Sequence, residues 1–243
     1  ELVSFRLGFD ENQMLTAIDL NILENCGAYG PHALTVMSVT AQKALSMYKA
    51  PSIRVNGDGV YTNLPIGGAY RGYGAPQAFF PLESLMDEAA ETMGIDPIEL
   101  RLKNVFKVGD DIPIAKILGE GREGFPMVLY STEIEACLEE GRILSDWERL
   151  RSEPGNGRYR RGIGVAVAGQ GSGIPGIDMG AAFIKMNEDA SFNLQVGATD
   201  LGTGSDTALA QIAAEVLGVS VDKIIVYSSD TDMTPFDTGA YAS

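Results

Sequence analysis

Histidine and cysteine are almost absent from this 243-residue sequence, which contains one histidine, His32, and two cysteines, Cys26 and Cys137. A structural zinc ion takes four nitrogen or sulfur ligands, and an iron–sulfur cluster is usually held by four cysteine thiolates. Because three residues cannot supply four ligands, we expect neither kind of centre and assign no metal ligands. The two cysteines form no C-x-x-C pair, which is more typical of a reducing compartment than of a disulfide-stabilised protein.

Basic residues are outnumbered, since 18 lysines and arginines stand against 33 aspartates and glutamates, and the formal net charge is −15. This charge repels a polyphosphate backbone, so we do not expect nucleic-acid binding. A small anionic ligand is compatible with it, because local backbone amides and one arginine can outweigh a distant net charge.

Long apolar runs are also missing. No stretch of about eighteen apolar residues occurs, so we expect no membrane-spanning segment. The sequence starts at Glu1 without a charged and then apolar leader. We therefore predict no export signal and a cytoplasmic location.

The elements that are present alternate between strands and helices. Residues 3–8 and 14–22 are predicted to form a β-hairpin, and Asn56-Gly57-Asp58-Gly59, inside an extended segment at 51–65, is typical of a turn. Further strands are predicted at 162–169, 179–186, 191–198 and 222–230, and helices at 77–93, 96–106, 132–152 and 206–218. The fold class is therefore α+β (mixed α/β), with two subdomains that each contain a sheet packed by helices.

Two glycine-rich stretches are candidate binding loops. GSGIPG at 171–176 matches the G-x-G-x-x-G dinucleotide pattern, but a strand is predicted after it where a helix is required, so a loop between strands is favoured. GTGSDT at 202–207 does precede a helix, and Ser205 is placed to cap it. The free amides of that helix could hold an anion, and an ordinary strand-to-helix turn fits the sequence equally well.

The stretch AYRGYGAPQ, residues 69–77, places Arg71 between two tyrosines and next to glycine. Arg71 offers a rigid fork of donors, Gly72 lets a ligand approach the backbone, and Tyr73 offers a ring face. These features indicate a ligand-binding loop, and the alternative is an arginine packed between aromatic rings in a turn.

Three stretches together resemble the molybdopterin-binding subunits of the xanthine dehydrogenase and aldehyde oxidase family, the molybdenum hydroxylases. TNLPIGGAYRGYGAPQ resembles the first cofactor loop of that family, DLGTGSDTALAQIAAEVLGV the second, and DTDMTPFDTGAYAS the third. The second and third look most like the bacterial branch that includes nicotinate dehydrogenase.

The resemblance implies a role for particular residues. Tyr73 is expected to contact the ring of the substrate. The residues expected to bind the cofactor are Tyr70, Arg71 and Gly72 in the first loop, Leu201, Gly202 and Thr203 in the second, and Tyr241, Ala242 and Ser243 in the third. The catalytic glutamate of the family belongs to a later motif that this sequence does not contain. We therefore expect either an internal piece of the molybdenum subunit or one subunit of a divided molybdenum subunit, which is inactive alone.

The same resemblance implies a domain organisation and a reaction. Residues 1–118 are expected to be the C-terminal part of a first molybdopterin-binding domain, 119–160 a connecting helix and linker, and 161–243 the N-terminal part of a second such domain. The cofactor is expected to be molybdenum–molybdopterin in its cytosine dinucleotide form, with iron–sulfur clusters and FAD on partner subunits or domains, and with the remaining part of the molybdenum subunit as a further partner.

The expected reaction is hydroxylation of an N-heterocycle, an aldehyde or a related aromatic small molecule, with water as the oxygen source. The alternative is a non-catalytic subunit-assembly module that has retained the fold.

Overall fold

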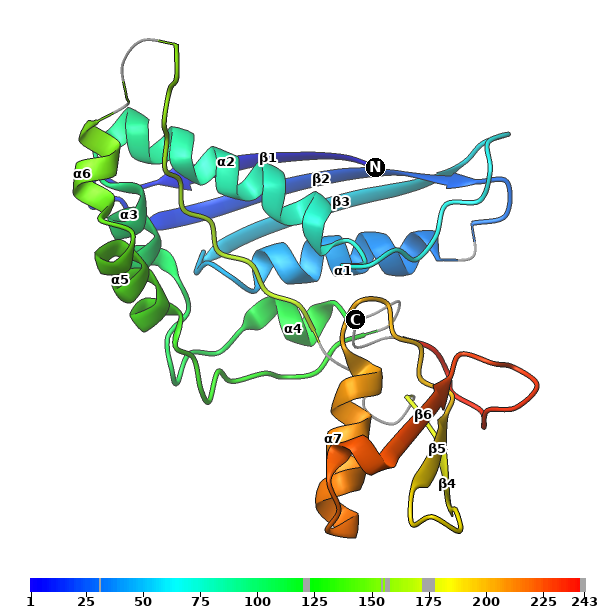
Figure 1. The fold of residues 1–243 in the computed structure, drawn as a ribbon. Helices are drawn as coiled ribbons and strands as arrows, with labels where there is room; N and C mark the ends of the chain where they lie inside the picture. The colour runs from blue at the N-terminus through cyan, green and yellow to red at the C-terminus, as the bar shows by residue number, and fades with distance from the viewer. Residues whose placement is uncertain (31, 120–122, 154, 156–157, 172–177, 241–243) are drawn as a thin grey trace. The chain divides into compact units, whose positions relative to one another are not determined.

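The structure, a computed structural model, describes residues 1–30, 32–119, 123–153, 155, 158–171 and 178–240. The chain divides into two units, Glu1–Gln170 and Gly171–Ser243. Each unit has one three-stranded sheet packed by helices (Figure 1), which confirms the predicted mixed α/β fold class. Of the helices in the described ranges, none has the length and apolar character needed to cross a membrane.

The first unit contains three strands and six helices in its described residues. They are β1 (Leu2–Phe9), β2 (Leu15–Gly27), α1 (Ala33–Leu45), β3 (Ser52–Tyr61), α2 (Ala75–Met93), α3 (Pro97–Asn104), α4 (Pro113–Ile117), α5 (Ile134–Leu144) and α6 (Trp147–Ser152). Strand β2 lies in the middle of the sheet, antiparallel to β1 and parallel to β3. The predicted hairpin of residues 3–8 and 14–22 is therefore confirmed as β1 and β2.

One face of this sheet is covered by the two long helices. Helix α1 packs on β2 and β3, and α2 packs on β1 and on α1. Alternate residues of β2 point into this core, among them Ile18, Leu20 and Ile22, each at most 3% exposed. The opposite face is polar, because Arg6 and Arg54 on the outer strands both donate to Asp19 on β2. Period-two alternation thus decides which face of the sheet receives helices.

The second unit has a smaller sheet and one main helix. It contains β4 (Ala182–Met186), β5 (Phe192–Val196), α7 (Ser205–Leu217), a 3-10 turn (Val221–Lys223) and β6 (Ile224–Ser228). The strand order is β4-β5-β6, with β4 antiparallel and β6 parallel to β5. Helix α7 packs three buried alanines against β5 and β6: Ala210, Ala213 and Ala214 lie in one cluster with Leu194, Val196 and Ile224. The strands and the helix predicted for this part of the sequence are confirmed.

The predicted turn at Asn56-Gly57-Asp58-Gly59 is wrong. Strand β3 runs through these residues without interruption and pairs with β2. A Cβ atom on Gly57 would lie 2.6 Å from the sulfur of Met37 on α1, and one on Gly59 would lie 3.2 Å from the sulfur of Cys26. The glycines therefore leave room for neighbouring side chains. The Asn-Gly-Asp-Gly sequence that meets this packing requirement also resembles the sequence of a turn.

The predicted single helix at 132–152 is also wrong. The chain breaks between α5 and α6 at Asp146, which has a left-handed backbone with φ 54°. This break turns Trp147 into the core, where its indole N–H donates to Asp96 at 2.8 Å. Glu135, in the first turn of α5, accepts from Lys107. Burial of the tryptophan outweighs the helical preference of the intervening residues.

The predicted strand at 162–169 is extended but is assigned to no sheet. Within this segment, Val167 N–H donates to the carboxylate of Glu83 at 2.9 Å. Its side chains still alternate, since Ile163, Val165 and Val167 pack against the first unit's core. The alternation therefore identified the extended conformation and the buried face, but not a pairing partner.

Candidate functional site

The loop that contains residues 69–74 connects β3 to α2 and has an unusual backbone. Gly72, Tyr73 and Gly74 all have positive φ, at 93°, 40° and 91°. A Cβ atom on Gly74 would lie 2.7 Å from the carbonyl oxygen of Val36 on α1. The backbone of the loop therefore lies directly against α1, where no larger residue fits. Tyr70 is 85% exposed, and Arg71 is also exposed.

The base of the same loop is fastened to the end of β2. Thr62 N–H donates to the carbonyl of Gly27 at 3.0 Å, and Gly67 N–H donates to that of Cys26 at 3.3 Å. The side chain of Asn25 accepts from the hydroxyl of Thr62 at 2.8 Å and from Gly27 N–H at 3.0 Å. These hydrogen bonds attach the first part of the loop, at Thr62 and Gly67, to the end of β2.

Tyr73 contacts the single histidine of the chain. The hydroxyl of Tyr73 lies 2.9 Å from Nδ1 of His32, and the two rings meet edge to face with their centroids 6.0 Å apart. Sequence reasoning missed His32 as a site residue, because it precedes Tyr73 by 41 positions and no local pattern connects them.

The second predicted loop, around Gly202, precedes α7 in the second unit. The carboxylate of Asp200 accepts from the N–H groups of Gly202 and Gly204, at 2.7 and 3.2 Å. These amide bonds hold the pKa of Asp200 below its ordinary value. The prediction that Ser205 caps the helix is wrong, since Gly204 occupies the N-cap position and Ser205 makes no capping bond. Asp200 instead places a negative charge beside the N-terminus of α7, where the helix dipole favours it. The D-x-G-x-G spacing was the pattern that could have revealed this role.

The second and third predicted loops line one cavity of the second unit. The cavity has a volume of about 310 Å³, and its lining residues include Thr203 and Ser205 from the second loop and Asp237, Thr238 and Ala240 from the third. The hydroxyl oxygen of Ser205 is buried and has no hydrogen-bond partner among the described atoms. The predicted residues Tyr241, Ala242 and Ser243 lie outside the described residues, directly after Ala240.

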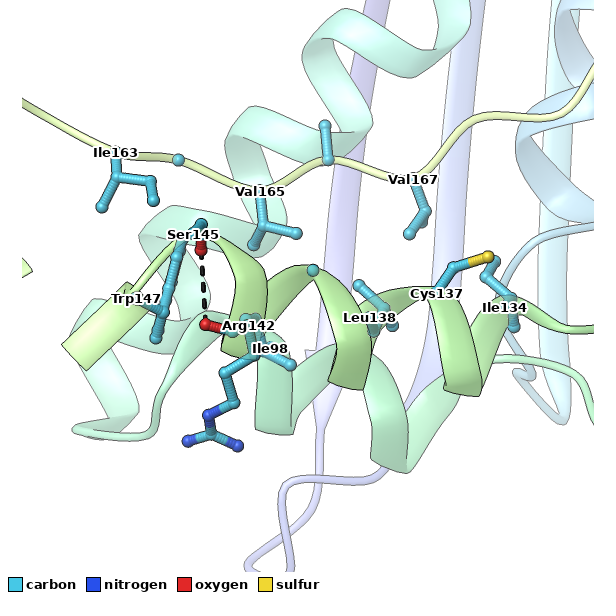
Figure 2. Close-up of a pocket in the computed structure, with 13 residues that line it drawn as sticks. Ile98, Ile134, Cys137, Leu138, Arg142, Ser145, Trp147, Ile163, Val165 and Val167 are labelled. Carbon is cyan, nitrogen blue, oxygen red and sulfur yellow. Dashed lines mark hydrogen bonds between the residues drawn. The ribbon is translucent and has the colours of Figure 1, made fainter. Parts of the chain in front are cut away.

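A second cavity, of about 260 Å³, lies in the first unit between α3, α5 and the extended segment 163–167 (Figure 2). Ile163, Val165 and Val167 point toward α5, and Leu138 and Trp147 complete an apolar wall. None of the predicted site residues lines this cavity. Its mainly aliphatic lining has few polar groups that could orient a ligand, so we interpret it as imperfect packing beneath the segment.

Metal-binding side chains do not gather in the described ranges: no group of three or more histidine, cysteine, aspartate or glutamate residues there has the geometry to hold a metal ion. Cys26 is buried and Cys137 is exposed, and both are free thiols.

Comparison with known proteins gives the same assignment to both parts of the chain. Residues 2–105 match one molybdopterin cofactor-binding domain family, and residues 140–243 match a second family with the same description. The chain belongs to the molybdopterin-binding proteins of the xanthine dehydrogenase and aldehyde oxidoreductase family. The family predicted from the three loop sequences is confirmed.

Individual relatives support this membership. A putative xanthine dehydrogenase molybdenum-binding subunit of Escherichia coli is 40% identical over 243 residues, covering 98% of this chain and 31% of the relative. A probable hypoxanthine oxidase of Escherichia coli is 36% identical over 99% of this chain and 25% of the relative. The crystal structure of the aldehyde oxidoreductase from Desulfovibrio desulfuricans superposes with a TM-score of 0.78 at 29% identity, covering 99% of this chain and 26% of that one. The chain thus spans about a third or less of the length of these molybdopterin-family proteins.

Proposed function

We propose that this chain is a cofactor-binding part of a molybdopterin-dependent oxidoreductase that hydroxylates an N-heterocycle, an aldehyde or a related aromatic molecule with water as the oxygen source. The observation that carries the proposal is the cavity of the second unit, where the second and third family loops meet. These loops are separated in the sequence by α7, a 3-10 turn and β6, so their convergence is a property of the fold.

The donor and acceptor groups of this cavity fit a hydrogen-bonding heterocycle. Thr199, Thr203, Ser205 and Thr238 supply hydroxyls, and the Ser205 hydroxyl oxygen is buried without a partner. Hydroxyls both donate and accept, as the ring nitrogens and amino group of a pterin require. Among the described residues the lining includes no lysine or arginine. The cavity therefore suits the neutral ring system better than the phosphate end of the cofactor.

The loop at residues 69–74 would supply the cationic contact. Arg71 is exposed, and its guanidinium presents a planar fork of donors that suits an anionic or carbonyl-bearing group. Tyr70 and Gly72 would contribute backbone contacts, and the ring face of Tyr73 would contact the substrate. Leu201, Gly202 and Thr203, together with Tyr241, Ala242 and Ser243, complete the proposed cofactor-binding set.

When bound, the molybdenum cofactor supplies the redox chemistry, while the protein supplies binding, orientation and electrostatics. We propose the cytosine dinucleotide form of the cofactor, a cytoplasmic location, and partners that carry iron–sulfur clusters, FAD and the remaining part of the molybdenum subunit. The boundaries 1–118, 119–160 and 161–243 are the domain division that we propose for the chain. The general base is expected on that remaining part, so the isolated chain should have no activity.

The proposal is tested by metal and pterin analysis of the complete complex purified from its native host, followed by assays with nicotinate, purines and benzaldehyde. We expect molybdenum and pterin in the wild type. Arg71→Gln and Thr203→Val should each lower cofactor occupancy at limiting cofactor. Arg71→Gln removes a charge-assisted hydrogen bond, so we expect the affinity for the cofactor to fall about tenfold, and Thr203→Val should lower the affinity less.

Matched controls are Arg6→Gln, an exposed arginine on the polar sheet face, and Thr92→Val, an exposed threonine of α2. Both should retain wild-type occupancy. An intact complex without molybdenum, or equal losses in the controls, contradicts the proposal. The first of these outcomes favours the non-catalytic assembly module.

A further inference from the structure

The contact between His32 and Tyr73 constrains the tyrosine ring in two independent ways. The hydrogen bond between Nδ1 of His32 and the tyrosine hydroxyl, at 2.9 Å, fixes the far end of the side chain. The edge-to-face contact, with an interplanar angle of 83°, opposes rotation of the ring about its own axis. Both residues are half-buried, so neither ring is as free as an exposed side chain.

The backbone on both sides of the contact is constrained as well. Tyr73 has a positive φ of 40°, a conformation that costs a non-glycine residue free energy unless its surroundings impose it. Gly74 is buried against Val36 and Thr40 of α1, the same helix that begins directly after His32. His32 occupies the N-cap position of α1, but its side chain makes no capping bond. The imidazole is therefore available for Tyr73.

We propose that His32 is a positioning residue that holds Tyr73 with its ring face toward the substrate, so that the site selects planar aromatic substrates by stacking. This inference rests on the proposed function, in which Tyr73 contacts the substrate. Because His32 takes up one hydrogen-bonding direction of the hydroxyl, the ring face is the main recognition surface of Tyr73. A ring that is already fixed loses less conformational freedom when a substrate stacks on it.

The structure suggests three informative variants. His32→Ala removes both constraints, whereas His32→Asn retains a polar side-chain atom close to the position of Nδ1. Tyr73→Phe keeps the ring and removes only the hydrogen bond. If the residues act as one unit, the effects of His32→Ala and Tyr73→Phe on binding will not add.

The experiment uses the complete enzyme complex. Calorimetry measures the Kd of quinoline, a planar probe, and assays compare kcat/KM for benzaldehyde with that for acetaldehyde, which has the same reacting group without a ring. We expect His32→Ala to raise the quinoline Kd by about 3- to 10-fold and to lower the benzaldehyde-to-acetaldehyde ratio by a similar factor, mainly through KM. His32→Asn should recover most of the loss.

A crystal structure of the His32→Ala complex separates failure of this inference from failure of the proposed function. If the wild type contains no molybdenum, the proposed function fails, and the position of the Tyr73 ring alone decides the role of His32. A molybdenum-loaded wild type that binds no quinoline overturns the stacking inference and leaves the proposed function standing. We expect that ring to be displaced or disordered in the variant. An unchanged ring, or an unchanged quinoline Kd in a molybdenum-loaded variant, overturns the proposal.

Discussion

Glu83 on α2 is a residue on which several buried polar groups of the first unit converge. Its carboxylate accepts from the Tyr48 hydroxyl at 2.6 Å, from Arg101 Nε at 2.8 Å and from Val167 N–H at 2.9 Å. Arg101 is fully buried. Burial, and next the charge of Glu83, raise the pKa of Tyr48 well above its ordinary value. One carboxylate thus joins α2, α3, Tyr48 in the loop after α1, and the extended segment.

Replacing this carboxylate should destabilise the first unit. Glu83→Gln removes the charge that pairs with buried Arg101 and exchanges an acceptor for a donor, so we expect a loss of about 3 kcal/mol in the free energy of unfolding. Urea denaturation of the chain measures it. Glu88→Gln, an exposed position on the same helix, is the control and should change stability by less than about 0.5 kcal/mol. If Glu83→Gln lowers the free energy of unfolding as little as Glu88→Gln does, the network contributes little to stability.

At the scale of single residues, the sequence indicated some of the candidate site and concealed the rest. Arg71 and Tyr73 belong to a local motif, so the amino-acid sequence was enough to select them as candidate site residues. His32 acts through a contact that its own neighbourhood in the sequence does not suggest, whereas the contacts of Asp200 with Gly202 and Gly204 are local and were overlooked. The His32–Tyr73 contact exists because α1 and α2 pack together, which a local pattern cannot express.

At the scale of elements, the sequence was reliable where a local rule governs. The side chain of Asp96 caps α3 by accepting from Ile98 N–H at 2.8 Å, as its Asp-Pro sequence predicts. Gly94 ends α2 with a left-handed backbone at φ 65°. The failures at Gly57, at Asp146 and in the 162–169 segment share one cause. In each, a contact with a distant element decided the local conformation.

The two glycines that flank α2 provide a test of this distinction. Gly94 has a positive φ and nothing within 4 Å of a Cβ atom, whereas Gly74 has a positive φ and a backbone oxygen at 2.7 Å. Gly94→Ala should therefore cost about 1 kcal/mol, the penalty of the left-handed conformation alone. Gly74→Ala should cost at least about 3 kcal/mol, because α1 must also move.

Thermal or urea unfolding of the two variants provides the comparison, and circular dichroism confirms that both retain native helix content. Similar losses at the two positions would mean that α1 and α2 do not approach as closely as the structure indicates.

At the scale of the whole molecule, the two units differ in how much core they bury. The first unit has a continuous cluster that includes residues of both long helices, of β2 and of the extended segment. The cluster of the second unit consists of Leu194, Val196, Ala210, Ala213, Ala214 and Ile224, half of them alanines. Buried apolar area is the main stabilising contribution to folding, so the second unit should be the less stable.

Hydrogen exchange followed by mass spectrometry on the intact chain tests this difference. We expect peptides from β5 to exchange at least about tenfold faster than peptides from β2, since both are central strands but only β2 lies over a large core. The central position of both strands makes them matched probes. Equal protection would show that stability is shared across the two units.

The sequence alone determined the family, the fold class, most of the strands and helices, and the loop residues that carry a recognisable motif. These depend on local spacing, on capping residues and on short stretches that can be compared directly. Only the tertiary structure decided that Glu83 anchors the extended segment and that His32 contacts Tyr73. Each of these is a hydrogen bond whose partners meet because of how the chain folds or turns back on itself, and linear spacing does not encode that proximity.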